Sequence, residues 1–204
     1  MVASRNKKVS FIITLAGPSV SGEKILIQQN KEIFINQKID SAEVAGYLDV
    51  FFKPSLAVFQ SETDSTTAVS AIIKNGQEFR QKYPKANFDL RVSSAEKTAP
   101  IFYKQINNPW FRYFILTDPL PYWQKITCNT LALFGSLDLQ VNPQINANEL
   151  VKLQKSNIET QILPNHNHLF QTAKNGSINE YFLIKEDISD LTLQKILNFI
   201  KSQQ

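Results

Sequence analysis

The stretch Thr130-Leu131-Ala132-Leu133-Phe134 decides the fold class, because it is short, almost entirely apolar and closed by Gly135. A continuous apolar run of this length is typical of a strand that is covered on both faces, as in a parallel sheet. Residues 9–15 form a similar β-branched run, and residues 158–163 read as a third strand that ends at Pro164. The sequence therefore predicts an α/β fold built on a parallel sheet.

Helical patterns separate and follow these strands. Residues 23–35 read as a helix, Asn142-Pro143 supplies a helix start, and apolar residues near the C-terminus repeat at helical spacing over 193–200. Between residues 40 and 117 only helical stretches are evident, at 42–52, 66–83 and 94–106. We therefore expect core elements in residues 1–39, a helical lid in 40–117 and a C-terminal core in 118–204, with helices on both faces of the sheet.

Composition narrows the classes of function. The chain has 204 residues with 22 basic and 18 acidic side chains, and the resulting net charge of +4 is scattered along the sequence. No basic stripe indicates nucleic-acid binding, and no apolar run is long enough to cross a membrane. The single cysteine, Cys128, excludes an internal disulfide and a cysteine-rich metal site, and nothing in the sequence implies a cofactor.

Two ionisable residues follow the second and third predicted strands. Asp138 lies just beyond Gly135, and His168 lies in the loop after Pro164. Parallel strands collect reactive groups beyond their carboxyl ends, so these two side chains are expected side by side. A carboxylate that orients an imidazole, which in turn removes a proton from a hydroxyl, is the arrangement of an activated nucleophile.

Residues 134–141, Phe-Gly-Ser-Leu-Asp-Leu-Gln-Val, resemble the acid segment of the α/β-hydrolase superfamily, and residues 167–171 resemble its histidine loop. The resemblance is closest to bacterial lid-bearing esterases of the dienelactone-hydrolase type. Residues 15–18 and the stretch 108–114 are similar to that subgroup as well. The resemblance implies a serine hydrolase that cleaves small carboxylic esters, with Asp138 as the acid and His168 as the general base.

The nucleophile elbow of that family, Gly-x-Ser-x-Gly, is not found in the sequence. The resemblance places it before Met1, so we expect an N-terminally incomplete hydrolase that is inactive alone and self-associates through an exposed sheet edge. Ser19, in Gly17-Pro18-Ser19-Val20-Ser21-Gly22, is the one internal alternative, although Pro18 and Ser21 fit an elbow poorly. A complete enzyme that uses Ser19 remains one hypothesis, and a non-catalytic protein that binds a small molecule is another.

Several residues keep two interpretations. Trp110, Phe111 and Phe114 are candidates to line an acyl pocket, or they pack in the core where the lid meets the sheet. His166 and His168 form a His-x-His pair, but without a third ligand we expect no metal site, and His166 is expected to be a loop residue without a chemical role. A true start at Met1 implies a cytoplasmic protein; an export signal would belong to a preceding segment.

Overall fold

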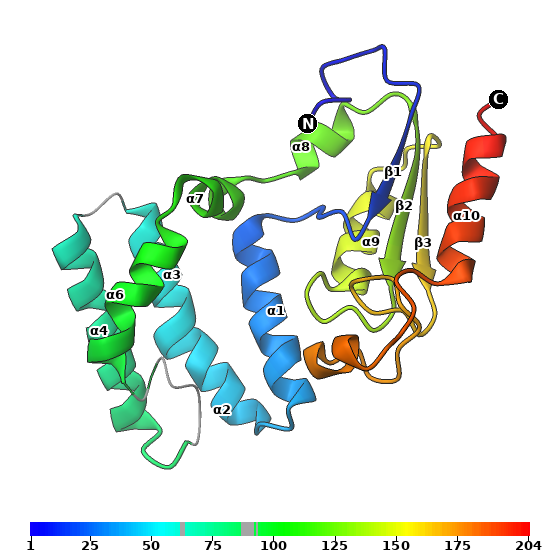
Figure 1. Ribbon diagram of the computed structural model, residues 1–204. Helices are drawn as coiled ribbons and strands as arrows, with labels where there is room; N and C mark the ends of the chain where they lie inside the picture. Colours follow the sequence, from blue (N-terminus) through cyan, green and yellow to red (C-terminus); the bar gives the residue numbers. More distant parts are fainter. Residues whose placement is uncertain (62–63, 87–91, 93) are drawn as a thin grey trace. The chain divides into compact units, whose positions relative to one another are not determined.

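The computed structural model describes residues 1–61, 64–86, 92 and 94–204. The chain divides into two compact units (Figure 1). The sheet unit consists of residues 1–21 and 118–204, and the helical unit consists of residues 22–117.

The sheet unit contains three parallel strands in the order β1-β2-β3. They are β1 (Phe11–Leu15), β2 (Asn129–Gly135) and β3 (Ile158–Leu163). The central strand β2 is buried from residue 130 to residue 135, as its continuous apolar sequence predicts. The predicted α/β class with a parallel sheet is confirmed.

Two long helices accompany this sheet, α9 (Pro143–Lys152) and α10 (Asp190–Lys201), and Figure 1 shows them on opposite sides of it. The predicted start of α9 is confirmed, since the side chain of Asn142 accepts the backbone N–H of Ile145 and Pro143 occupies the first turn. The ring of Phe199 on α10 meets the ring of Phe11 on β1 edge to face. The short helix α8 (Leu120–Gln124) and the 3₁₀ helix η2 (Ile178–Phe182) complete the unit.

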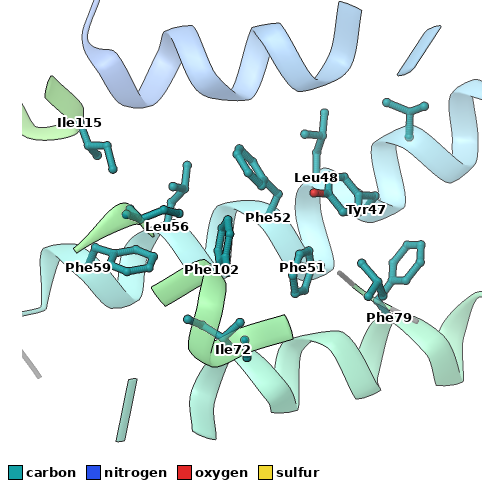
Figure 2. Close-up of a cluster of buried hydrophobic side chains, with 14 of the residues drawn as sticks. Tyr47, Leu48, Phe51, Phe52, Leu56, Phe59, Ile72, Phe79, Phe102 and Ile115 are labelled. Atoms are coloured by element: carbon teal, nitrogen blue, oxygen red, sulfur yellow. The ribbon is translucent and has the colours of Figure 1, made fainter. Parts of the chain in front are cut away.

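The helical unit has a hydrophobic core of its own (Figure 2). Its elements are α1 (Gly22–Asn36), α2 (Ser41–Gly46), the π-helix η1 (Tyr47–Phe52), α3 (Lys53–Gln60), α4 (Ser65–Lys82), α6 (Ala95–Ile106) and α7 (Pro109–Leu116). Aromatic side chains dominate this core, with Tyr47, Phe51 and Phe79 almost fully buried. The expected all-helical character of this region is therefore present in the described residues.

Helix α1 belongs to the helical unit, whereas the sequence interpretation grouped it with the sheet. Its first residue shows why, because a Cβ on Gly22 would lie 2.1 Å from the carbonyl oxygen of Phe114. The start of α1 thus packs directly on the backbone of α7. An amphipathic pattern predicts that a helix has a buried face, but it does not say which core that face joins.

Helix η1 interrupts a continuous helical segment that runs from α2 into α3. The backbone N–H of Lys53 bonds to the carbonyl of Leu48, five residues earlier, which is the π-helical pattern. Pro54 follows immediately, and a proline has no N–H and a ring that clashes with the preceding turn of an α-helix. The wider π-helical turn accommodates Pro54 without ending the helix.

Candidate active site

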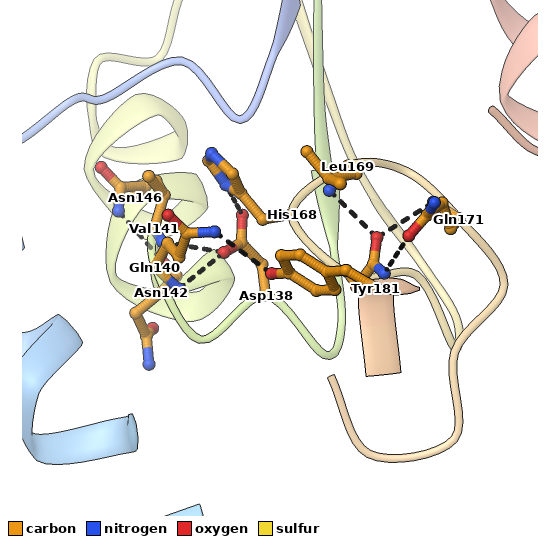
Figure 3. A network of polar contacts seen from close by, with 10 residues as sticks. Asp138, Gln140, Val141, Asn142, Asn146, His168, Leu169, Gln171 and Tyr181 are labelled. Carbon is orange, nitrogen blue, oxygen red and sulfur yellow. Dashed lines mark hydrogen bonds and ion pairs between the residues drawn. The ribbon is translucent and has the colours of Figure 1, made fainter. Parts of the chain in front are cut away.

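The candidate site lies in the sheet unit, where two loops leave the carboxyl ends of neighbouring strands. Asp138 follows β2, and His168 follows β3. Nδ1 of His168 lies 2.8 Å from Oδ2 of Asp138 (Figure 3). The carboxylate accepts, so Nδ1 carries the hydrogen, and in the neutral form of the ring Nε2 has the lone pair. The predicted juxtaposition of these two residues is thus present.

The two partners differ in exposure. The side chain of Asp138 is fully buried, whereas the side chain of His168 is 30% exposed. Within the residues that the structure describes, no hydrogen bond reaches Nε2 of His168. The imidazole is therefore held at one nitrogen, and the other nitrogen is available to take up a proton.

The second carboxylate oxygen of Asp138 fixes its own loop. Oδ1 accepts the backbone N–H groups of Gln140 at 2.8 Å and Val141 at 2.9 Å. With the imidazole on Oδ2, the buried carboxylate has three donors, which satisfies a charge that burial would otherwise make costly. Asp138 is therefore a turn residue that also accepts a hydrogen bond from the imidazole of His168.

The histidine loop is built around Asn167, which is completely buried. Its side-chain oxygen accepts the backbone N–H groups of Leu169 and Gln171, and its amide donates to the side chain of Gln171. Phe170, also buried, has a φ of 60°, a conformation that most residues avoid. These contacts define the backbone on both sides of His168.

Gly135 lets the two loops approach each other. A Cβ at this position would lie 2.4 Å from the carbonyl oxygen of His166 and 2.6 Å from that of Asn167. The backbone N–H of Leu137 donates to the same His166 carbonyl, at 2.9 Å. The histidine loop therefore crosses directly over the end of β2, which brings His168 to Asp138.

Tyr181 on η2 touches both loops, and the sequence interpretation missed it. Its hydroxyl accepts the side-chain amide of Gln140 at 3.2 Å, and the backbone N–H of His168 is close enough to affect its pKa. Burial raises the pKa of Tyr181 above 10.0, and the nearby Asp138 charge adds to this shift. No motif or periodicity marks Tyr181, because its role depends on contacts between distant parts of the chain.

Glu180 forms hydrogen bonds to a turn next to the site. Its carboxylate accepts the backbone N–H groups of Lys174 at 2.7 Å, Asn175 at 3.1 Å and Gly176 at 2.9 Å. Gly176, with a φ of 71°, packs so closely on the acid loop that a Cβ would meet the carbonyl oxygen of Leu137 at 1.9 Å. Glu180 thus stabilises the turn at residues 174–176, which packs against the loop of Asp138.

His166 is buried and has a structural role. Nδ1 lies 2.7 Å from the carbonyl of Pro164, so it donates, and Nε2 lies 2.5 Å from the hydroxyl of Ser189. Ser189 caps α10 by accepting the N–H of Thr192. His166 therefore connects the histidine loop to the last helix.

Ser19, the internal candidate for the nucleophile, is fully buried. Its hydroxyl donates to the backbone carbonyl of Asn146 at 2.7 Å, and its backbone N–H donates to the Asn146 side chain at 2.8 Å. A serine nucleophile would instead donate to the imidazole. The hydrogen bonding of Ser19 joins the loop after β1 to α9 and gives no support to a nucleophilic role.

The three aromatic candidates, Trp110, Phe111 and Phe114, belong to α7 of the helical unit. Their ring centroids lie 5.9–6.0 Å apart, and Trp110 stacks on Phe114 while remaining 70% exposed. Phe111 and Phe114 pack against the core of that unit. Core packing therefore accounts for Phe111 and Phe114, whereas Trp110 presents its ring to solvent.

The described residues contain no group of three side chains suited to hold a metal ion and no helix long and apolar enough to span a membrane. No protein-family model, curated protein or solved structure matches this chain.

Proposed function

We propose that Asp138 and His168 are the acid and the general base of a hydrolase that cleaves carboxylic ester bonds. The observation that carries the proposal is the 2.8 Å contact between a buried carboxylate and an imidazole whose second nitrogen is not hydrogen-bonded within the described residues. Nε2 would take the proton of an attacking hydroxyl and later return it to the leaving alcohol, while Asp138 stabilises the imidazolium. The resemblance to lid-bearing esterases supports the ester as substrate.

The proposal assigns no attacking hydroxyl among the described residues, because the hydroxyl of Ser19 donates to Asn146 and no described hydroxyl bonds to Nε2 of His168. Without the serine no acyl-enzyme can form, so the chain alone is not expected to turn over an ordinary ester, but an imidazole can still act as a general base that activates water toward a reactive aryl ester. We therefore expect the purified chain to hydrolyse p-nitrophenyl acetate slowly, and His168→Ala to remove this activity. Ser19→Ala is the matched control and should keep the activity. An unchanged rate of hydrolysis in His168→Ala would contradict the proposal.

A second candidate function is binding of a small molecule without catalysis. It is favoured by the buried state of Ser19 and by the lack of a described hydroxyl at Nε2 of His168. A fluorophosphonate probe separates the alternatives when combined with the ester assay. A stoichiometric adduct on Ser19 would indicate a complete enzyme, and no adduct with no His168-dependent hydrolysis would indicate binding alone.

A further inference from the structure

A groove in the helical unit has the composition of a ligand site. It has a volume of about 300 Å³, which is at the lower end of the range for small-molecule pockets. Its apolar wall consists of Leu26, Phe52, Phe102, Ile106 and Phe111, contributed by four different elements of the unit. All of its lining residues lie within the helical unit, so the groove is defined independently of Asp138 and His168.

The polar residues that line the groove, within the part of the chain that the structure describes, are the neutral amides Gln29, Asn30 and Gln105. Asn30 donates to the carbonyl of Leu26, while the side chains of Gln29 and Gln105 have no hydrogen-bond partner within the described residues. An amide group both donates and accepts, so it can bind an alcohol, ester, amide or amine. Among the described lining residues no side chain is charged, so a charged ligand would lose its hydration without compensation.

The π-helix η1 contributes to this groove. Phe52, its last residue, lies in the apolar wall and is 3% exposed. A π-helical turn is less favourable than an α-helical one and occurs frequently at functional sites. Figure 2 shows the Phe52 ring directed from η1 toward the neighbouring helix α1, on which Leu26 and Gln29 lie. The last residue of the π-helix is therefore part of the wall of the groove.

We propose that the helical unit binds a neutral, mostly apolar small molecule in this groove, with one uncharged polar group held by the amides of Gln29 and Gln105. The aromatic wall surrounds the apolar body, and the amides orient the polar group. This binding does not depend on the proposed ester hydrolysis.

The experiment is a fluorescence titration of the full chain with N-phenyl-1-naphthylamine, an uncharged aromatic amine that brightens in apolar surroundings. We expect saturable binding of one molecule per chain. The anionic relative 8-anilinonaphthalene-1-sulfonate should bind at least about tenfold more weakly, because a charge is costly in this lining. The absence of saturable binding, or equal affinity for the two dyes, would overturn the proposal.

Two matched substitutions locate the bound dye. Gln105 and Gln81 are both exposed and both stand next to the last residue of their helix, α6 and α4, but only Gln105 lines the groove. Gln105→Glu should weaken binding of the neutral dye by about tenfold, whereas Gln81→Glu should leave it unchanged. Gln29→Glu provides a second test from α1. Equal affinity in all three variants would place the dye elsewhere and refute this site.

Discussion

Nδ1 of His168 lies 2.8 Å from Oδ2 of Asp138, although the two residues are 30 positions apart. Neighbouring parallel strands bring them together, and the close crossing at Gly135 sets the final distance. The histidine loop crosses the loop that carries Asp138. The side chain of Asp138 is buried, and the side chain of His168 is partly exposed.

Two substitutions of Asp138 distinguish its contact with His168 from its hydrogen bonds within the loop. Asp138→Asn can still accept the N–H groups of Gln140 and Val141, but its amide cannot accept the hydrogen of His168. Asp138→Ala loses both functions. We expect both variants to lose most of the His168-dependent ester hydrolysis, and only Asp138→Ala to lose about 2 kcal/mol or more of unfolding free energy. Ester assays and urea denaturation check this, and equal stability of the two variants would contradict it.

Gly135→Ala tests the crossing of the two loops. The added methyl would meet two backbone carbonyl oxygens at 2.4 Å and 2.6 Å, and backbone cannot move aside as a flexible side chain can. We expect a loss of about 1–3 kcal/mol of unfolding free energy, measured by urea denaturation, together with a disturbed histidine loop. The Nδ1 proton signal of His168 in NMR spectra reports on that loop. An unchanged signal in a fully stable variant would show that the loops tolerate the side chain.

The strands and the position of the site follow from local sequence patterns. The apolar run at 130–134 marks a strand covered on both faces, and residues after neighbouring parallel strands must lie at the same edge. The packing of α1 in the helical unit and the contacts of Tyr181 could not be predicted from local patterns. Both depend on which distant surfaces meet, and neither helical periodicity nor a motif carries that information. Helix α7 also has a local signal, because Asn108 followed by Pro109 is typical of a helix start.

Ser19→Ala distinguishes a structural serine from a nucleophile. The variant leaves the buried carbonyl of Asn146 without its hydroxyl donor, so we expect a loss of about 1–3 kcal/mol of unfolding free energy. The ester hydrolysis per folded molecule should not change. Thermal unfolding and the ester assay at a temperature where the variant is folded measure the two quantities. Loss of hydrolysis without loss of stability would reverse the assignment of Ser19.

Tyr181→Phe tests the link between η2 and the two loops. The phenol accepts from Gln140, and burial raises its pKa in the folded chain above the unfolded value of 10.0. The stability that this neutral phenol contributes is present below about pH 10 and is lost as the pH rises through the folded pKa. The urea midpoint should therefore decrease less between about pH 8 and about pH 11 in Tyr181→Phe than in the native chain. An identical fall in both would mean that Tyr181 titrates as freely in the folded chain as in the unfolded one.

Glu180→Gln gives the opposite dependence on pH. Partial burial raises the pKa of the Glu180 carboxyl, but the backbone N–H groups of residues 174–176 and the charge of Lys174 outweigh it, so the pKa lies below 4.5. The stabilisation is present above about pH 4.5 and is lost as the pH falls through the folded pKa, because the carboxylate must be protonated. The native chain should thus be more stable than Glu180→Gln at about pH 6, and the difference should shrink at about pH 3. Urea midpoints at the two pH values measure this, with the exposed Glu78→Gln as the control. A stability difference that does not change with pH would show that the charge of Glu180 does not stabilise the turn at Gly176.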